Sequence, residues 1–350
     1  MNTPTLSPIP VTLLSGFLGA GKTTVLNHLL KSPDGLRFAI VENEFGAINI
    51  DSQLISRSNG GIVELTNGCV CCTINDDLVR GLQDLGSRRT SGELSFDWIV
   101  IETTGLADPG AVAQTFFASP ELREGFMLDG IIVVVDAVHA MKQLDEHHVV
   151  QRQIGFADRL LLSKCDLAEP DALDALSERL RQINPRAPLQ RLDHGRAEPN
   201  TILNIGGFNL DTSLLASDVV SGGSATIRII PKSSSSAGAQ RRLPVAPVHE
   251  NSITSFLLEA GEVDLDGIGT FVQNMIDDLG DNLLRYKGIL AIPDEPRKLI
   301  FQGVQRIAGF DFGEPWTTDE QRISRIVVIG RDLPEERLRS DFLGCVINPI

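Results

Sequence analysis

The residues best suited to chemistry begin with the run GFLGAGKTT at positions 16–24. It has the spacing of a phosphate-binding loop: Gly16, four residues, Gly21, Lys22 and the hydroxyl of Thr23. Glycines lack a Cβ, so the backbone can form a concave ring of N–H groups at the start of a helix, where the partial positive charge attracts anions. The predicted nucleotide contacts are Gly16, Gly19, Ala20, Gly21, Lys22, Thr23 and Thr24. We expect Lys22 to reach the β and γ phosphates and Thr23 to bind magnesium.

A second group consists of three cysteines within four residues, Cys69, Cys71 and Cys72, in the run GCVCC. A structural zinc site usually closes with four ligands, and this run offers three thiolates close together. Such an incomplete site suits a metal that is held and passed on, with water, a carboxylate, a receiving protein, or His194 or His249 supplying a further ligand. Thiolates favour zinc or Cu(I), and cobalt or nickel are acceptable in vitro. A redox thiol pair and inert cysteines are the alternatives.

Acidic residues follow two predicted strands. Glu44 and Asp51 lie in ENEFGAINID after the second strand, where a carboxylate could touch magnesium, orient an attacking water or help to bind a second metal. With Lys22, they are the predicted catalytic residues, although charged loop side chains are often simply solvated.

Glu102 ends the apolar strand DWIVIE, three residues before Gly105. This spacing suits an indirect magnesium contact by Glu102 and a γ-phosphate contact by the Gly105 N–H. Asp136 ends the strand IIVVVDA in a similar way and competes with Glu102 for the magnesium role.

The run RLLLSKCD places Lys164 and Asp166 after a further strand. A carboxylate at Asp166 can accept hydrogen bonds from both N1–H and the exocyclic amine of guanine, whereas adenine would leave it facing an acceptor. Lys164 is expected to lie along the face of the base. The pair therefore predicts GTP rather than ATP.

The elements that position these residues alternate between short apolar runs and amphipathic stretches, which is typical of parallel strands joined by helices. Strands are predicted at 10–14, 37–42, 97–102, 130–136, 159–163 and 187–191. Leucines at helical spacing predict helices around 78–85 and 171–183. Ligands bind at the carboxyl ends of the strands in such sheets, where the residues above are placed.

The pattern changes after about residue 215. A stretch rich in Ser, Gly and Pro, with the β-like run TIRII inside it, predicts a linker or mobile loop over 216–248. From 249 to 350 the sequence predicts strands at 253–260, 298–307 and 324–330 and helices at 266–279 and 334–343. The predicted fold is thus an α/β P-loop NTPase domain with a mostly parallel sheet over 1–215, followed by a smaller C-terminal α+β domain over 249–350.

Composition narrows the class of partner. The chain has 350 residues and a formal net charge of −15, which argues against extended contact with nucleic acid or anionic lipid. The N-terminus lacks a basic start and a long apolar core, and the clustered cysteines do not resemble a disulfide framework. We expect a cytoplasmic protein that does not bind membranes.

Taken together, these residues make the chain resemble the CobW-like family of P-loop GTPases, metallochaperone relatives of the nickel-delivery GTPases. The shared runs are GFLGAGKTT, ENEFG, LTNGCVCC, IETTGLADP, VVDA and SKCD, and RYKGIL, FQGVQR, Trp316 and VVIGRDL resemble the family's C-terminal domain. The resemblance implies a slow GTPase using GTP and Mg²⁺. It also implies that GTP controls binding of zinc, or cobalt, at Cys69, Cys71 and Cys72 and its transfer to a client metalloprotein.

Two departures from the family stand out. Ala47 replaces an acidic residue that is common after ENEFG, and Arg241 and Arg242 lie in a junction where many relatives carry a histidine-rich tract.

Three alternatives stay open at this point. They are cobalt delivery for cobalamin synthesis or for a nitrile hydratase, a nucleotide-switched metal or redox regulator that delivers no metal, and an ATP-dependent enzyme. The protein could also form a homodimer.

Overall fold

The computed structural model describes residues 8–31, 35–43, 74–208 and 253–347. Its N-terminal domain is built on a six-stranded parallel sheet with the order β2-β3-β1-β4-β5-β6. The strands are β1 (Ile9–Gly16), β2 (Phe38–Asn43), β3 (Trp98–Thr103), β4 (Phe126–Asp136), β5 (Arg159–Ser163) and β6 (Leu189–Arg191). All six predicted strands are confirmed, and so is the parallel α/β arrangement.

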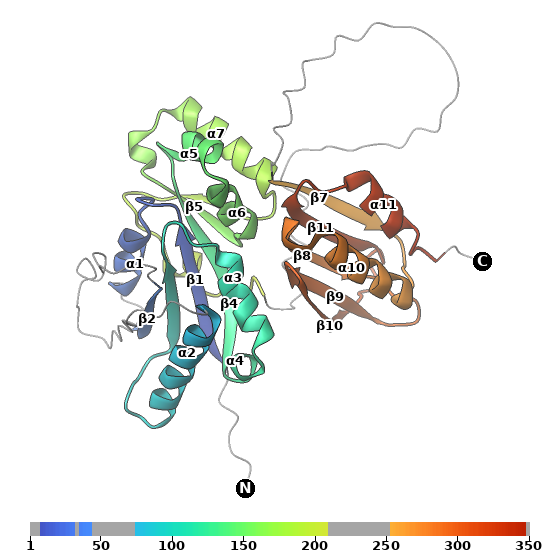
Figure 1. The fold of residues 1–350 in the computed structure, drawn as a ribbon, viewed down its shortest axis with the longest axis horizontal. Helices are drawn as coiled ribbons and strands as arrows, with labels where there is room; N and C mark the ends of the chain where they lie inside the picture. The colour runs from blue at the N-terminus through green and yellow to red at the C-terminus, as the bar shows by residue number, and fades with distance from the viewer. Residues whose placement is uncertain (1–7, 32–34, 44–73, 209–252, 348–350) are drawn as a thin grey trace, which may run out of the picture.

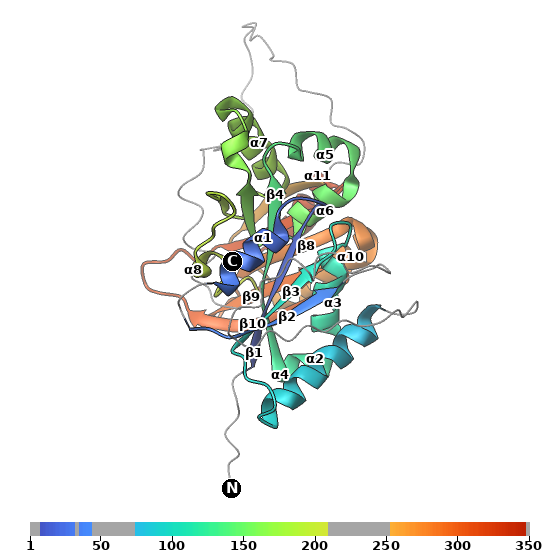
Figure 2. The same cartoon turned by 90° about the vertical axis from the view of Figure 1, so that its left-hand side faces the viewer.

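Helices cover both faces of this sheet, because its central strands are apolar on both sides. One face packs against α2 (Ile74–Thr90), α3 (Pro109–Ala118), α4 (Pro120–Gly125), α5 (Ala140–Glu146), α6 (His148–Phe156) and α7 (Pro170–Ile183). The other face packs against α1 (Lys22–Leu30) and α8 (Pro199–Ile202). Figures 1 and 2 show the sheet between the two layers. The leucine stripes predicted around 78–85 and 171–183 are buried on α2 and α7.

The C-terminal domain is a five-stranded antiparallel sheet with the order β10-β9-β8-β11-β7. Its strands are β7 (Ile253–Ala260), β8 (Leu283–Leu290), β9 (Arg297–Val304), β10 (Ile307–Pro315) and β11 (Ser324–Arg331). Helices α10 (Leu265–Leu279) and α11 (Glu335–Leu343) pack on one face, where the rings of Phe271 and Phe342 lie 5.6 Å apart. This is the predicted α+β domain.

The other face of the antiparallel sheet packs against the N-terminal domain. Five of its side chains belong to the same buried cluster as α3, α6 and α7: Ile253, Leu284, Val304, Val327 and Ile329. Figure 1 shows strands of this sheet facing the side of the parallel sheet that carries α3 and α6. The two domains therefore share one apolar core.

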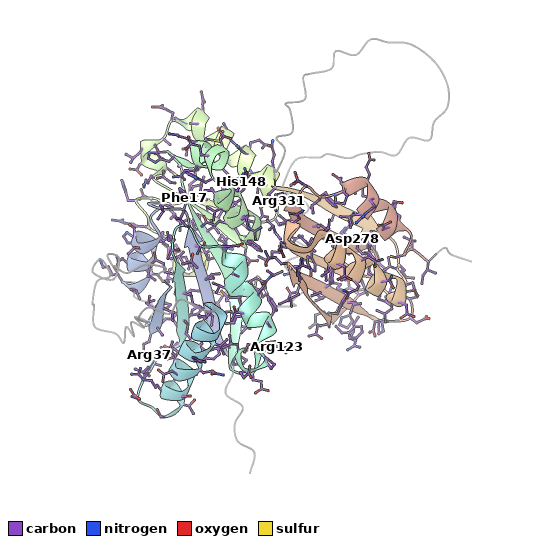
Figure 3. The ribbon with its side chains drawn as sticks, viewed as in Figure 1. Phe17, Arg37, Arg123, His148, Asp278 and Arg331 are labelled. Carbon is purple, nitrogen blue, oxygen red and sulfur yellow. The ribbon has the colours of Figure 1, made fainter. Side chains whose placement is uncertain are left out.

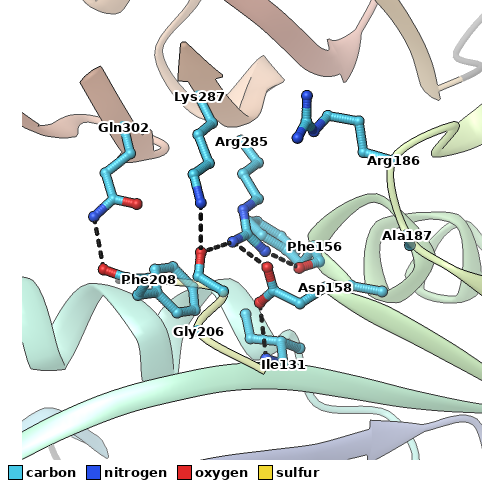
Figure 4. Close-up of polar contacts among 12 residues, drawn as sticks. Ile131, Phe156, Asp158, Arg186, Ala187, Gly206, Phe208, Arg285, Lys287 and Gln302 are labelled. Carbon is cyan, nitrogen blue, oxygen red and sulfur yellow. Dashed lines mark hydrogen bonds and ion pairs between the residues drawn. The ribbon is translucent and has the colours of Figure 1, made fainter. Parts of the chain in front are cut away.

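A buried ion pair crosses the junction within this core. The guanidinium of Arg285 on β8 pairs with Asp158 and donates to the carbonyl oxygens of Phe156 at 2.8 Å and Gly207 at 2.9 Å (Figure 4). Both charged side chains are at most 10% exposed. Asp158 also accepts a hydrogen bond from the Ile131 N–H at 2.9 Å, so its carboxylate ties β4 to the C-terminal domain.

Further contacts extend this junction along residues 207 and 208. The Lys287 ammonium donates to the Gly207 carbonyl at 3.4 Å, and the Gln302 amide donates to the Phe208 carbonyl at 2.9 Å. The Arg285 guanidinium lies 4.4 Å from the centre of the Phe208 ring (Figure 4). Residues 207 and 208 are thus hydrogen-bonded to side chains of both β8 and β9.

One sequence prediction in the C-terminal domain is wrong, and two strands, β8 and β10, were not predicted. The strand predicted over 298–307 ends at Val304, because Gln305 adopts a left-handed conformation with φ of 51° and the chain turns into β10. A Gln-Arg pair lacks the Asn-Gly signal of a two-residue turn, so the hairpin was missed. Strand β8, which is almost entirely buried, was not predicted from periodicity either. The predicted linker at 216–248, including its β-like run, lies outside the described residues.

None of the helices that the structure describes is both long and apolar enough to cross a membrane.

Replacing Arg285 with Met should destabilise the protein by about 3–5 kcal/mol, because it leaves the Asp158 carboxylate buried without its cation. The free energy of unfolding in urea measures this. The matched control is Arg325→Met, which removes an exposed pair with Glu259 and should change stability by at most about 1 kcal/mol. Equal effects of the two substitutions would contradict the structural role of the buried pair.

Candidate functional site

The glycine-rich loop joins β1 to α1 in the predicted strand-loop-helix arrangement. Gly16, Gly19 and Gly21 have positive φ angles of 142°, 71° and 99°. A Cβ on Gly16 would lie 2.3 Å from the Val134 carbonyl oxygen, so only glycine fits beside β4 at this point. Gly21 caps α1 without any side-chain hydrogen bond, and the first turn holds no acidic residue. The helix N-terminus is therefore suited to an anion.

The side chain of Lys22 lies across this loop. Its ammonium donates to the carbonyl oxygens of Gly16 at 3.0 Å and Phe17 at 3.3 Å. From the other side, the Ser163 hydroxyl at the end of β5 donates to the Ala20 carbonyl at 2.6 Å. The loop is thus held to the sheet with a cation at its opening, which suits a polyphosphate.

The two predicted magnesium residues lie together. The Thr23 hydroxyl at the start of α1 donates to the Glu102 carboxylate at 3.0 Å, and Glu102 is 7% exposed near the end of β3. A hydroxyl and a carboxylate are hard oxygen ligands of the kind that Mg²⁺ prefers. The donor set therefore fits this ion.

Asp136, the competing candidate, is occupied by other partners. Its carboxylate accepts hydrogen bonds from the Lys164 ammonium at 2.7 Å, from His139 Nδ1 at 3.0 Å and from the Val138 N–H at 2.9 Å. Burial raises the pKa of Asp136, but these donors outweigh it and hold the pKa below its usual value. The carboxylate is ionised at neutral pH and positions Lys164, so the geometry favours Glu102 for magnesium.

Lys164 and Asp166 follow β5 at the same edge of the sheet. Lys164 has a left-handed φ of 56°, and its ammonium also donates to the Gly19 carbonyl at 2.9 Å, so the side chain crosses to the phosphate loop. The Asp166 side chain is 37% exposed and lies 3.6 Å from His194 Nδ1. The Asp166 carboxylate is thus accessible beside the turn that carries His194, and its base-reading role stays a prediction of the sequence.

The turn at 193–196 belongs to this site, although sequence reasoning missed it. A Cβ on Gly195 would lie 2.8 Å from the methyl carbon of Thr24, so this turn packs on the start of α1. The sequence suggests His194 only as a further ligand for the cysteines. Because the turn follows β6, the rule that ligands bind after parallel strands could have identified it.

Gly105 contacts the phosphate loop directly. A Cβ on Gly105 would lie 2.5 Å from the Leu18 backbone nitrogen, so the two backbones meet with no room for a side chain. On its other side, the Gly105 carbonyl accepts a hydrogen bond of 3.1 Å from the amide of Gln153 on α6. Sequence reasoning did not identify Gln153.

The predicted catalytic residues Glu44 and Asp51 and the predicted metal ligands Cys69, Cys71 and Cys72 lie outside the described residues. The chain enters that region from Asn43, which pairs with Thr103 at the end of β3. The residues that the structure describes contain no cluster of three or more His, Cys, Asp or Glu side chains placed to hold a metal ion.

Family models match both domains. Residues 10–191 match a model described as "CobW/HypB/UreG, nucleotide-binding domain". Residues 253–346 match one described as "Cobalamin synthesis protein cobW C-terminal domain".

Individual relatives match nearly the whole chain. The zinc chaperone YjiA of Escherichia coli is 41% identical over 340 residues, which are 97% of this chain and 99% of the relative. The zinc chaperone CobW of Pseudomonas aeruginosa is 31% identical over 385 residues, covering 97% and 92%. The crystal structure of the Zn(II)-bound YjiA GTPase from E. coli is similar with a TM-score of 0.75 and 38% identity, covering 98% of this chain and 100% of that one.

Replacing Gly105 with Ala should weaken binding of a non-hydrolysable GTP analogue with Mg²⁺ by about tenfold, since an overpacked contact costs about 1–3 kcal/mol. Gly105 has no positive φ, so the added methyl conflicts only with the phosphate loop. GDP should bind with little change, because it lacks the γ phosphate that the Gly105 N–H is predicted to contact. Equilibrium titration with fluorescent nucleotides measures both affinities.

The matched control for this substitution is Gly125→Ala on α4, where an added Cβ would meet no atom within 4 Å. Wild-type affinity of the Gly105→Ala variant for the GTP analogue would contradict the importance of this contact.

Proposed function

The chain belongs to the CobW/HypB/UreG family of GTPases, and we propose that it loads zinc onto a client metalloprotein under the control of GTP. One observation carries the nucleotide part of this proposal: Thr23 and Glu102 are joined by a hydrogen bond at the mouth of the phosphate loop. The zinc part is supported by relatives that are named zinc chaperones and match nearly the whole chain. Those names favour zinc over cobalt.

In the proposed complex, the nucleotide is held by groups from several strand ends. The loop N–H groups and Lys22 bind the phosphates, Lys164 lies along the base, and Asp166 accepts hydrogen bonds from guanine N1–H and the exocyclic amine. The ion pair with Asp136 and the hydrogen bond to the Gly19 carbonyl support this placement of Lys164.

Thr23 and Glu102 are the residues that would hold Mg²⁺, the latter through water. The ion neutralises phosphate charge when it is bound. The Gly105 N–H would contact the γ phosphate, and we assign the orientation of the attacking water to Glu44 and Asp51. These roles rest on sequence position and on the contact between Gly105 and Leu18.

Zinc, the cargo, would bind to Cys69, Cys71 and Cys72. The segment that carries them connects β2 with α2 in the sequence, and β2 pairs along its length with β3, which carries Glu102. This connectivity supports a coupling in which the γ phosphate tightens the zinc site and hydrolysis loosens it for transfer. The client, a cytoplasmic location and a homodimer stay predictions of the sequence.

A non-hydrolysable GTP analogue with Mg²⁺ should raise the zinc affinity of the purified protein relative to GDP. A coupling free energy of about 1–3 kcal/mol corresponds to roughly 5- to 150-fold. Competition with a chromogenic zinc chelator measures the affinity in each state. Cys71→Ser serves as the control and should weaken zinc binding with either nucleotide. Equal zinc affinity with the analogue, with GDP and without nucleotide would refute the coupling.

Replacing Asp166 with Asn should shift specificity from GTP to xanthosine triphosphate. The Asn amide donates, so it faces the exocyclic amine of guanine unfavourably but can pair with the carbonyl that xanthine carries there. We expect GTP affinity to fall by about 5- to 150-fold, the effect of a buried donor left unpaired. Competition titrations measure both nucleotides.

Asp171→Asn, which changes an exposed carboxylate on α7, is the control for the specificity change. A variant at Asp166 that keeps full preference for GTP would rule out the guanine-reading role.

A further inference from the structure

Gln153 lies buried between the phosphate site and the C-terminal domain. It is 1% exposed on α6, and its amide nitrogen donates to the carbonyl oxygens of Gly105 at 3.1 Å and Ala107 at 3.0 Å. Its own carbonyl oxygen, Oε1, is buried without a hydrogen-bond partner among the described residues. An unsatisfied buried carbonyl is costly, so a residue of similar size without it, such as Met, would be expected if Gln153 only filled space.

The contacts of Gln153 determine where Gly105 lies. By holding two carbonyls of segment 105–107, Gln153 fixes the peptide planes that follow Gly105, while the other side of Gly105 lies against the Leu18 backbone. The neighbouring Arg152 pairs with Asp108, whose carboxylate also accepts the Gly110 N–H at the start of α3. Two adjacent residues of α6 therefore hold the whole segment from Gly105 to the first turn of α3.

The start of α6 touches the phosphate loop independently. The ring of His147, which precedes the helix, stacks on the ring of Phe17 with centroids 4.9 Å apart. Figure 3 labels Phe17 and His148, the residue after His147, near each other in the upper half of the N-terminal domain. A displacement of the phosphate loop would thus move α6 at two points, at its start through Phe17 and in its middle through Gly105 and Gln153.

The end of α6 contacts the C-terminal domain. A Cβ on Gly155 would lie 2.9 Å from Leu284 on β8 and 3.4 Å from Ile253 on β7. The Phe156 carbonyl accepts the hydrogen bond from Arg285, and the Gln151 side chain accepts one from the Ile253 N–H at 3.4 Å. One short helix therefore touches the phosphate loop, segment 105–107 and both β7 and β8.

We propose that Gln153 is a positioning residue that holds Gly105 for contact with the γ phosphate and, through α6, couples the nucleotide state to the C-terminal domain. The inference rests on the proposed function, since it assumes GTP at the phosphate loop. The coupling requires segment 105–107 and α6 to adopt two arrangements, one for each nucleotide state. When Gly105 moves toward a γ phosphate, the Gln153 amide follows it. The Gln153 Oε1 then becomes available to an N–H of the shifted segment.

The test replaces Gln153 with Met, which keeps the volume and removes the donor. Affinity for a non-hydrolysable GTP analogue with Mg²⁺ should fall by at most about 5- to 150-fold, the full effect of two lost hydrogen bonds, whereas GDP affinity should stay within about twofold. Amide hydrogen exchange gives the second readout. In the wild type, β7 and β8 should exchange more slowly with the analogue than with GDP, and in Gln153→Met this difference should disappear.

Gln302→Met is a matched control at the domain junction. Gln302 is 8% exposed, donates to the Phe208 carbonyl and also has a buried Oε1 without a partner in the described structure, but no contact with segment 105–107 is found for it. The Gln302→Met variant should keep both the higher affinity for the analogue than for GDP and the slower hydrogen exchange of β7 and β8 with the analogue. The inference fails if Gln153→Met keeps them too, or if Gln302→Met loses them equally.

A second variant changes α6 where it contacts the C-terminal domain, in case Gln153→Met does not fold. The added methyl of Gly155→Ala pushes only on the flexible end of Leu284. Coupling between two sites is the same in both directions, so a change where α6 meets the C-terminal domain should also change nucleotide binding. We expect the ratio of analogue to GDP affinity to change by about threefold or more. An unchanged ratio would overturn the coupling. If the wild type itself shows no preference for GTP over ATP, the proposed function fails, whereas normal GTP binding with unaltered variants refutes this inference alone.

Discussion

The close approach of Gly105 to the Leu18 backbone is the constraint on which the site depends. Because there is no space for a Cβ, the chain leaving β3 runs directly against the phosphate loop. The same strand places Glu102 beside Thr23, so the candidate magnesium contact and the candidate γ-phosphate contact lie three residues apart on one rigid support. A change in the loop cannot be accommodated by a side chain between the two backbones, and the segment after β3 must move with it.

The shared apolar core gives such a movement a consequence beyond the nucleotide site. Side chains of β7, β8, β9 and β11 are buried with those of α3 and α6, so the C-terminal domain is packed on helices that follow segment 105–107, the candidate contact to the γ phosphate. The buried pair of Arg285 and Asp158 reinforces this packing. Close-packed cores shift between discrete arrangements more readily than they deform continuously, which would suit the proposed coupling of the nucleotide site to the C-terminal domain.

Local pattern predicted most of the fold and the strand-end residues, because alternating apolar and amphipathic runs and the glycine spacing are encoded within a few residues. The residues that join distant elements were not predicted. Gln153 is an ordinary glutamine in a helix until its amide meets segment 105–107. The sequence alone could not show that Asp136, the competitor of Glu102 for magnesium, has Lys164 and His139 as partners. The hairpin at Gln305 was missed since its turn lacks glycine. These features depend on tertiary contacts.

The most direct test of the account is the amide hydrogen exchange of segment 104–107 in the wild-type protein, compared between GDP and a non-hydrolysable GTP analogue with Mg²⁺. The account predicts slower exchange with the analogue, because the γ phosphate engages the Gly105 N–H and fixes the segment against the phosphate loop. Equal exchange in the two nucleotide states, with both nucleotides bound at saturation, would contradict the claim that this segment senses the terminal phosphate.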